Sequence, residues 1–428
     1  MYDDSQTNER SGTNKLVPFQ SESQRTQGSI PRPLGRNGAT CVAPGPGLAL
    51  GYDTFHSEFS RSVMISDRAK SLNRQSLTID IHNHMMFEFA IRQQAYGEKD
   101  IFDTVFAPRL QTGGINVIAT SVGSNSPCLC NLTDDLVLGS LEQIDMLRIE
   151  EQSSKCMAIC CSVDDIIAAA GQDKAAVLLA FEGARAMEGL SGEDSMVLLR
   201  TFYRLGLRIN CIVGAARTMF ADGMGEAGAD AGLTTYGVKL VKEMNKIGML
   251  IDLTHMNDRS FFDVMEVSDK PVIVSHVGVQ AVCDNPNNLS DEQVLAMGKN
   301  GGVICMEIVK IEVDRDAYLK GESIDFNRVV DHIDHIVQLI GPDHVGLGLD
   351  FDNFTHVNNI HRAMCPAPGS IEGYYTGIPE GDHMLNEPKN DSEAYVIAEY
   401  LVKRGYSDAD ILKILGGNLL RVLGETIW

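Results

Sequence analysis

The chain has 428 residues, of which 44% are hydrophobic and 22% charged, so a globular protein with a sizeable core is expected rather than a disordered chain. Asp and Glu outnumber Lys and Arg by 58 to 36, which gives a net charge of −22. So acidic a surface repels phosphate backbones and anionic bilayers, which argues against nucleic acid or a membrane surface as the main partner.

The first 55 or so residues are rich in Ser, Thr, Gln, Arg, Gly and Pro and show no apolar periodicity. This composition predicts a disordered or loosely attached arm over 1–55, in front of a single domain over 56–428. The start of the arm lacks the charged-then-apolar order of a signal peptide, and no later run approaches the roughly 18 apolar residues of a membrane helix. We therefore expect no membrane span and a cytoplasmic protein.

After a polar helical stretch at 56–76, short β-branched apolar runs alternate with longer amphipathic stretches. The predicted strands cover residues 77–82, 115–122, 176–183, 207–213, 248–255, 271–277, 301–306 and 344–350. Eight strands alternating with helices predict a closed parallel (β/α)8 barrel of the TIM type, followed by a long polar loop from 351 to about 395 and a final helix. An open doubly wound sheet is the rival fold, but no Gly-x-Gly-x-x-Gly motif follows the first strand.

Residues able to bind a metal occupy the carboxyl ends of several predicted strands, which is where a barrel of this type carries its active site. They are His82, His84, Glu182, His255, His276 and Asp350. His82 and His84 are two residues apart on one strand, so both can reach the same ion. Each histidine alone would normally be a polar loop residue, but six such groups at strand ends indicate a metal site.

Six groups exceed the four ligands of one tetrahedral zinc ion, which favours two Zn2+ ions that share a carboxylate. The expected arrangement has His82 and His84 on one ion, His255 and His276 on the other, and Glu182 as the bridge. A water between two cations loses a proton near neutral pH and becomes a nucleophile, and Asp350 is expected to act as the catalytic base. Manganese, iron and cobalt remain alternatives to zinc.

From about residue 77 onwards, the chain resembles the membrane (renal) dipeptidases, which are zinc-dependent members of the amidohydrolase superfamily. The matching segments fall in family order and are IDIHNH, AFEGARAMEG, GLTTYGVKLVKEMNKIGMLIDLTH, VIVSHVGVQAVCDNPNNLSDEQ, GGVICM, HVGLGLDFDN and GGNLLRV. The resemblance implies a Glu-bridged zinc pair, hydrolysis of dipeptides, a small-molecule substrate and a homodimer. It also carries the metal-ligand role onto His82, Glu182, His255 and His276, and the catalytic role onto Asp350.

Three positions depart from the family pattern. His84 stands where the family has an aspartate, Gly214 where it has a substrate-facing histidine, and Asn287 where it has the arginine that binds the substrate carboxylate. Arg185 and Arg217 lie on nearby predicted loops and are candidates to supply the missing positive charge; a surface ion pair is the alternative for each. These departures leave the metal site intact but place the substrate in question.

Three functions stay open at this stage. The leading hypothesis is a dinuclear zinc hydrolase that cleaves the amide bond of a dipeptide or a dipeptide-like substrate. The second is a divergent amidohydrolase that acts on a non-peptide amide, lactone or other carbonyl compound in specialised metabolism. The third is an inactive metal-binding scaffold, against which Asp350 speaks, because a purely structural site needs no general base.

Overall fold

The computed structural model describes residues 63–124, 135–351 and 384–428, apart from residues 227, 230 and 386. The predicted arm over 1–55 and most of the predicted loop from 351 to 395 lie outside the described residues, so both stay predictions. Of the polar helix expected at 56–76, residues 56–62 also lie outside the described residues; from residue 63 on, α1 covers Asp67–Gln75 and begins after the N-cap Ser66.

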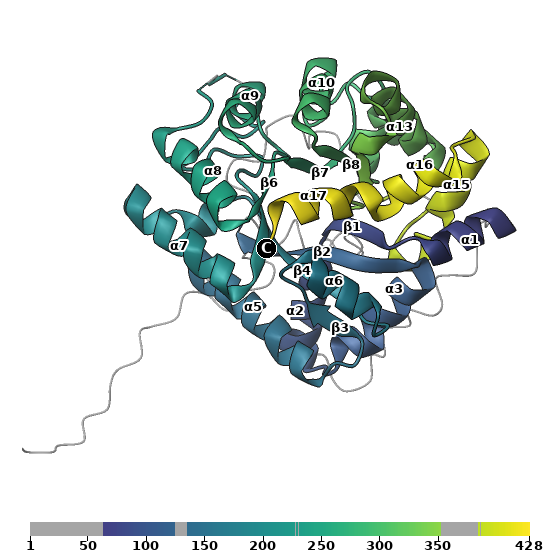
Figure 1. Cartoon of the computed structure of the whole chain (residues 1–428), viewed down its shortest axis with the longest axis horizontal. Helices are drawn as coiled ribbons and strands as arrows, with labels where there is room; N and C mark the ends of the chain where they lie inside the picture. Colours follow the sequence, from purple (N-terminus) through teal and green to yellow (C-terminus); the bar gives the residue numbers. More distant parts are fainter. Residues whose placement is uncertain (1–62, 125–134, 227, 230, 352–383, 386) are drawn as a thin grey trace, which may run out of the picture. The chain divides into compact units, whose positions relative to one another are not determined.

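Eight parallel strands form a closed ring (Figure 1), which confirms the predicted (β/α)8 TIM-type barrel. Each strand of the ring pairs with the next, and β9 pairs with β1 to close it. In ring order the strands are β1 (Thr78–Asn83), β2 (Ile115–Ser124), β4 (Ala175–Glu182), β5 (Leu207–Cys211), β6 (Leu250–Asp252), β7 (Ile273–Val277), β8 (Val303–Met306) and β9 (Val345–Leu347).

The helices surround this ring (Figure 1), as expected for parallel strands joined by helical crossovers. Besides α1, they are α2 (Met85–Tyr96), α3 (Ala107–Gly113), α5 (Leu136–Ser153), α6 (Val163–Ala170), α7 (Gly192–Leu205), α8 (Thr235–Ile247), α9 (Asp258–Val267), α10 (Asp291–Asn300), α11 (Lys310–Val313), α12 (Arg315–Leu319), α13 (Phe326–Ile340), α15 (Val396–Arg404), α16 (Asp408–Leu412) and α17 (Asn418–Thr426). Within the described ranges, none of them combines the length and the apolar character that crossing a bilayer requires.

Two details of the strands differ from the prediction. A further short strand, β3 (Met157–Ile159), pairs with residues 175–177 at the start of β4. The next residues of β4, 179–181, pair with β5 instead. Three residues are too few for a period-two pattern, so the sequence carries no signal for it. The strands before His255 and Asp350 are also shorter than predicted, because β6 ends at Asp252 and β9 ends at Leu347.

The core consists of two apolar clusters, one on each face of the barrel wall. The inner cluster includes Ile79, Ile81, Val117, Leu178, Ala180, Ile209, Leu250, Ile273, Val303 and Cys305. Side chains of α17 join it and close the end of the barrel where the strands begin, and Figure 1 shows this helix lying across the strands. The outer faces of the strands pack against the helices, which explains why the strands are apolar on both sides. Polar residues lie at the opposite end of the barrel, where the strands end.

A buried ion cluster fastens α2 to α3 beside the barrel. The Glu88 carboxylate accepts hydrogen bonds from Arg92 Nε at 2.8 Å and from the two terminal nitrogens of Arg109 at 2.7 and 3.0 Å. Burial alone would raise the pKa of Glu88, but the two guanidinium groups outweigh it and lower this pKa below its usual value. The stabilisation is therefore present above the pKa of Glu88 in the unfolded chain and is lost as the pH falls through its folded value.

Replacing Glu88 by Gln is expected to lower the free energy of unfolding by about 3 kcal/mol at neutral pH, because two arginines lose a buried partner. Urea denaturation measures the change. The matched control is Glu98→Gln, which removes a 39% exposed partner of Arg92 at 3.0 Å and is expected to cost about 0.5 kcal/mol or less. Equal losses for the two variants would contradict the role given to Glu88.

Candidate metal centre

All six candidate ligands lie at the C-terminal end of the barrel, opposite α17. Each comes from the end of a strand or from the residues directly after it: His82 and His84 at β1, Glu182 at β4, His255 after β6, His276 in β7 and Asp350 after β9. The structure therefore brings together the side chains that the sequence placed at separate strand ends.

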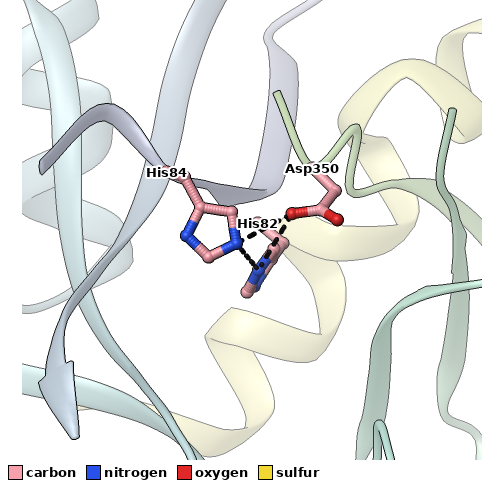
Figure 2. A group of neighbouring side chains, drawn as sticks. All are labelled: His82, His84 and Asp350. Atoms are coloured by element: carbon pink, nitrogen blue, oxygen red, sulfur yellow. Dashed lines mark hydrogen bonds and ion pairs between the residues drawn. The ribbon is translucent and has the colours of Figure 1, made fainter. Parts of the chain in front are cut away.

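The first group joins the two histidines of β1 to Asp350 (Figure 2). His82 Nε2 and His84 Nε2 are 3.3 Å apart, and Asp350 Oδ1 lies 2.9 Å from His84 Nε2 and 3.5 Å from His82 Nε2. Asp350 Oδ1 is buried, yet none of these contacts gives it a well-formed hydrogen bond within the described residues. Two imidazole nitrogens and one carboxylate oxygen that converge in this way suit a divalent cation.

Glu182 and His276 of β7 form a second converging group with His82, and His255, which follows β6, lies beside them. His255 Nε2 lies 3.1 Å from His276 Nε2 and 3.3 Å from Glu182 Oε1. The other oxygen, Glu182 Oε2, faces the first group, at 3.6 Å from His84 Nε2 and 3.9 Å from His82 Nε2. The two oxygens of one carboxylate thus face two different sets of imidazoles.

The backbone around the site adopts uncommon conformations. Four non-glycine residues in the described ranges have positive φ, and two of them are His255 at 66° and Asp350 at 54°. Such angles are disfavoured for residues with a Cβ and often mark functional sites. Hydrogen bonds hold one of them in place: Asp350 N donates to His82 O at 3.0 Å, and His84 N donates to Phe351 O at 3.2 Å. This ladder fixes Asp350 beside the histidines of β1.

Two buried aspartates support the ligand-bearing segments from below, and the sequence analysis missed them. Asp252 Oδ1 accepts hydrogen bonds from Thr254 N and Ser275 N, both at 3.0 Å. Asp80 Oδ1 accepts one from Leu349 N at 2.8 Å, and burial raises the pKa of Asp80 to about 8. The available signal was an acid inside an apolar strand two or three residues before a histidine, as in IDIH and LIDLTH.

The protonation states favour metal binding. Burial would raise the pKa values of Glu182 and Asp350, but the neighbouring histidines outweigh it and lower both. Burial also lowers the pKa values of His82 and His276, which keeps these imidazoles neutral. His255 differs: burial would lower its pKa, but Glu182 raises it to about 9, so a cation at this position would displace a proton.

Asn287 fixes the orientation of His255. Asn287 Nδ2 donates to Glu312 Oε2 at 2.6 Å, which leaves Asn287 Oδ1 to face His255 Nδ1 at 2.9 Å. Since Oδ1 is an acceptor, the proton of a neutral His255 lies on Nδ1, and the lone pair of Nε2 points at Glu182 and His276. This arrangement is typical of the residues that orient a metal-binding histidine.

Replacing Asn287 by Leu is expected to weaken metal affinity by about 10- to 100-fold, because His255 loses its acceptor. Competition with a chromophoric chelator measures the affinity. Glu312→Gln serves as the matched control, since its amide oxygen can still accept from Asn287 and the affinity should stay close to that of the unaltered chain. Unchanged affinity in the Asn287→Leu protein would show that the contact does not orient the ligand.

The residues considered for substrate binding lie in different settings. Gly214 is buried in the loop after β5, and Asn287 is engaged with His255 as described. Arg217 is exposed and forms a two-pronged ion pair with Asp222, which agrees with the alternative of a surface ion pair. Arg185 is exposed at the start of a short 3-10 turn that follows β4.

Two further acids at this end of the barrel, Glu307 and Glu312, were also missed. Glu307 is the first residue after β8, a position similar to that of Asp350 after β9. Glu312 lies in α11. An acid immediately after a predicted strand was a usable signal for Glu307. The position of Glu312 depends on how α11 folds back toward the site, and no local pattern indicates that.

Together, the closed barrel and the converging imidazole and carboxylate groups define a metal-dependent hydrolase. Residues 66–364 match the family described as membrane dipeptidase (peptidase family M19), so the chain belongs to that family. This confirms the resemblance noted in the sequence.

Curated relatives are dipeptidases. The chain is 30% identical to dipeptidase tcpJ of Claviceps purpurea over 359 residues, covering 81% of this chain and 76% of that one. It is 31% identical to dipeptidase 3 of Rattus norvegicus over 303 residues, covering 69% of this chain and 54% of that one. The chain thus spans about half the length of the rat protein.

Solved structures share the fold at lower sequence identity. An amidohydrolase from Pseudomonas aeruginosa superposes with a TM-score of 0.68 at 21% identity, covering 84% of this chain and 98% of the other. A metallopeptidase from Rhodobacter sphaeroides, solved with a phosphinate mimic of the dipeptide L-Ala-D-Ala, gives a TM-score of 0.63 at 21% identity and covers 82% and 99%.

Proposed function

We propose that the protein is a dinuclear zinc hydrolase that cleaves the amide bond of a dipeptide or dipeptide-like small molecule. The observation that supports it most is the position of Glu182, whose two carboxylate oxygens face the histidines of β1 on one side and His255 on the other. A bridging carboxylate between two ions needs this arrangement. The expected homodimer and cytoplasmic location stay predictions.

Each ligand residue has a defined part in this proposal. His82 and His84 would hold one ion, His255 and His276 the other, and Glu182 both. Bound as a pair, the ions would polarise the substrate carbonyl and make a water acidic enough to attack it. Asp350 lies within 2.9 Å of His84 and has a lowered pKa, and it would take the proton of the attacking water and pass it to the leaving amine. Its distance from His84 also permits it to act as a ligand.

Metal removal tests the proposal. Treatment of the full chain with a strong chelator is expected to lower dipeptide hydrolysis by at least about 100-fold, and two equivalents of zinc per chain should restore it. The measurement is turnover over a panel of dipeptides of both configurations, with metal content determined by mass spectrometry. Full activity in a metal-free sample would rule out the mechanism.

A second candidate is hydrolysis of an amide that has no free carboxylate. It is favoured by the surroundings of Asn287 and Arg217: the first is bound to His255 and Glu312, and the second is held by Asp222. The polar atoms of Asn287 are thus already engaged, and the charge of Arg217 is already paired with an acid. The same panel should therefore include dipeptide amides and simple amides, and a higher kcat/KM for these than for free dipeptides would favour the second candidate.

A further inference from the structure

Glu307 and Glu312 form a pair of buried carboxyl groups beside the metal-ligand cluster. Glu307 is 2% exposed and Glu312 is 5% exposed, and their side chains share a hydrogen bond. Within the described residues, Glu307 Oε1 has no hydrogen-bond partner. A buried oxygen without a partner is rare in proteins, because its lost hydration is not compensated.

The pair lies at the same end of the barrel as the six candidate ligands. Val303 and Cys305 of β8 belong to the inner cluster, so the alternation along the strand directs Glu307 to the inner side as well. β8 pairs with β7, which carries His276, and with β9, which precedes Asp350. Glu307 is as buried as His82 and His276, and it lies close enough to Asp350 for the two charges to interact.

Hydrogen bonds and charge connect the pair to the ligands. Glu312 accepts from Asn287, whose other end contacts His255. Burial raises the pKa of Glu307 well above its usual range, and the charges of Glu312 and Asp350 raise it further. A hydrogen bond between two carboxyl groups requires one proton between them, and the other oxygen of Glu307, Oε1, remains an acceptor within the described residues.

We propose that Glu307 and Glu312 form a specificity subsite that accepts a hydrogen bond from a protonated amine of the substrate, close to the bond that is cleaved. This rests on the proposed hydrolase function and adds the class of substrate: one that presents an ammonium group, not a carboxylate, to this side of the metal centre. Such a contact satisfies the free oxygen of Glu307, and a charge-assisted hydrogen bond is stronger than a neutral one.

Three metal-anchored probes of equal chain length test the subsite without requiring turnover. They are 3-aminopropanohydroxamic acid, butanohydroxamic acid and succinic monohydroxamic acid, which end in an ammonium, a methyl and a carboxylate group. Calorimetry on the zinc-loaded full chain near pH 7 gives their affinities. We expect the amine-ended probe to bind about tenfold tighter than the methyl-ended one, with the carboxylate-ended probe weakest. The two zinc ions alone would favour the carboxylate-ended probe. A preference for the amine-ended probe therefore requires acidic side chains near the ions.

The variant that removes the subsite is Glu307→Met, which keeps the length of the side chain but has no oxygen. We expect its preference for the amine-ended over the methyl-ended probe to fall about tenfold, to near unity. Glu307→Gln keeps an oxygen and the contact to Glu312, so it should retain part of the preference. Glu322→Gln changes an exposed acid in the segment between β8 and α13. It removes one charge outside the subsite and should leave the preference unchanged.

The outcomes separate two kinds of failure. If the methyl-ended probe binds but the unaltered chain prefers the carboxylate-ended probe, or if Glu307→Met keeps the full amine preference, the subsite is refuted while the metal centre stands. If none of the three probes binds the zinc-treated chain, the metal centre fails and the subsite fails with it. If the Glu307→Met protein does not fold, the subsite is tested by the order of the three probe affinities in the unaltered chain and in the Glu307→Gln protein.

Discussion

Replacing Glu182 by Gln is expected to reduce the metal content from two ions to one or fewer per chain and to lower kcat about a thousandfold. The reason is the position of its two oxygens, which face the histidines of β1 and His255 at 3.3 to 3.9 Å. An amide offers one oxygen and no charge, so it cannot serve both sides. Loss of one ion removes several kcal/mol of transition-state stabilisation.

The control for this variant is Glu193→Gln. Glu193 lies in α7, which follows the loop after Glu182, and its 81% exposed carboxylate pairs with Lys239 at 3.2 Å. The change in net charge is the same, but both metal content and turnover should stay close to those of the unaltered chain. Two ions bound to the Glu182→Gln protein would show that another group bridges them or that no bridge is needed.

The fold could be predicted from sequence to a large extent, because the barrel strands are buried on both faces. Each of them is a short β-branched run bounded by glycines or polar residues, and the amphipathic stretches between them are long enough for crossover helices. The ends of strands were less predictable. The run GMLIDLTH remains apolar past Asp252, but His255 turns to positive φ and leaves the sheet, which no hydrophobic pattern records.

The candidate ligands could also be expected from sequence, since a parallel barrel brings all strand ends to one side. What the sequence did not indicate is the set of groups that hold those ligands. The hydrogen bonds from His255 through Asn287 to Glu312 join residues that are 32 and 25 positions apart. They depend on how the loop after β7 packs against α11, and this is tertiary packing without a local signature.

The same contacts change how the departure at Asn287 is understood. In the sequence, Asn287 stands where the family has an arginine that binds the substrate carboxylate, so this residue represents the loss of that contact. In the structure it links a ligand histidine to Glu312, and through Glu312 to Glu307, so acids occupy the wall beside the metal centre. A wall of this kind repels a substrate carboxylate and attracts an ammonium group. The site therefore combines the cations implied by its histidines with an acidic neighbour that selects among substrates.

Replacing Asp350 by Asn is expected to lower kcat by about two orders of magnitude or more, the usual contribution of a general base, with a smaller effect on KM. The pKa of Asp350 is lowered, so its carboxylate is ionised and able to accept a proton throughout the neutral range. Asparagine has the same shape but cannot accept that proton. His82, His84 and Glu182 remain in the variant, so metal content measured by mass spectrometry should stay near two ions per chain.

Asp343→Asn provides the comparison, since Asp343 and Asp350 flank β9 on its two sides. Asp343 precedes β9 at the opposite end of the barrel, where its 62% exposed carboxylate pairs with Lys413 at 2.6 Å. Its removal should leave kcat unchanged, because it is separated from the metal centre by the length of the strand. A normal kcat in the Asp350→Asn protein would assign the proton transfer to another group. A low kcat together with lost metal would instead make Asp350 a ligand of the first ion, as its 2.9 Å distance from His84 allows.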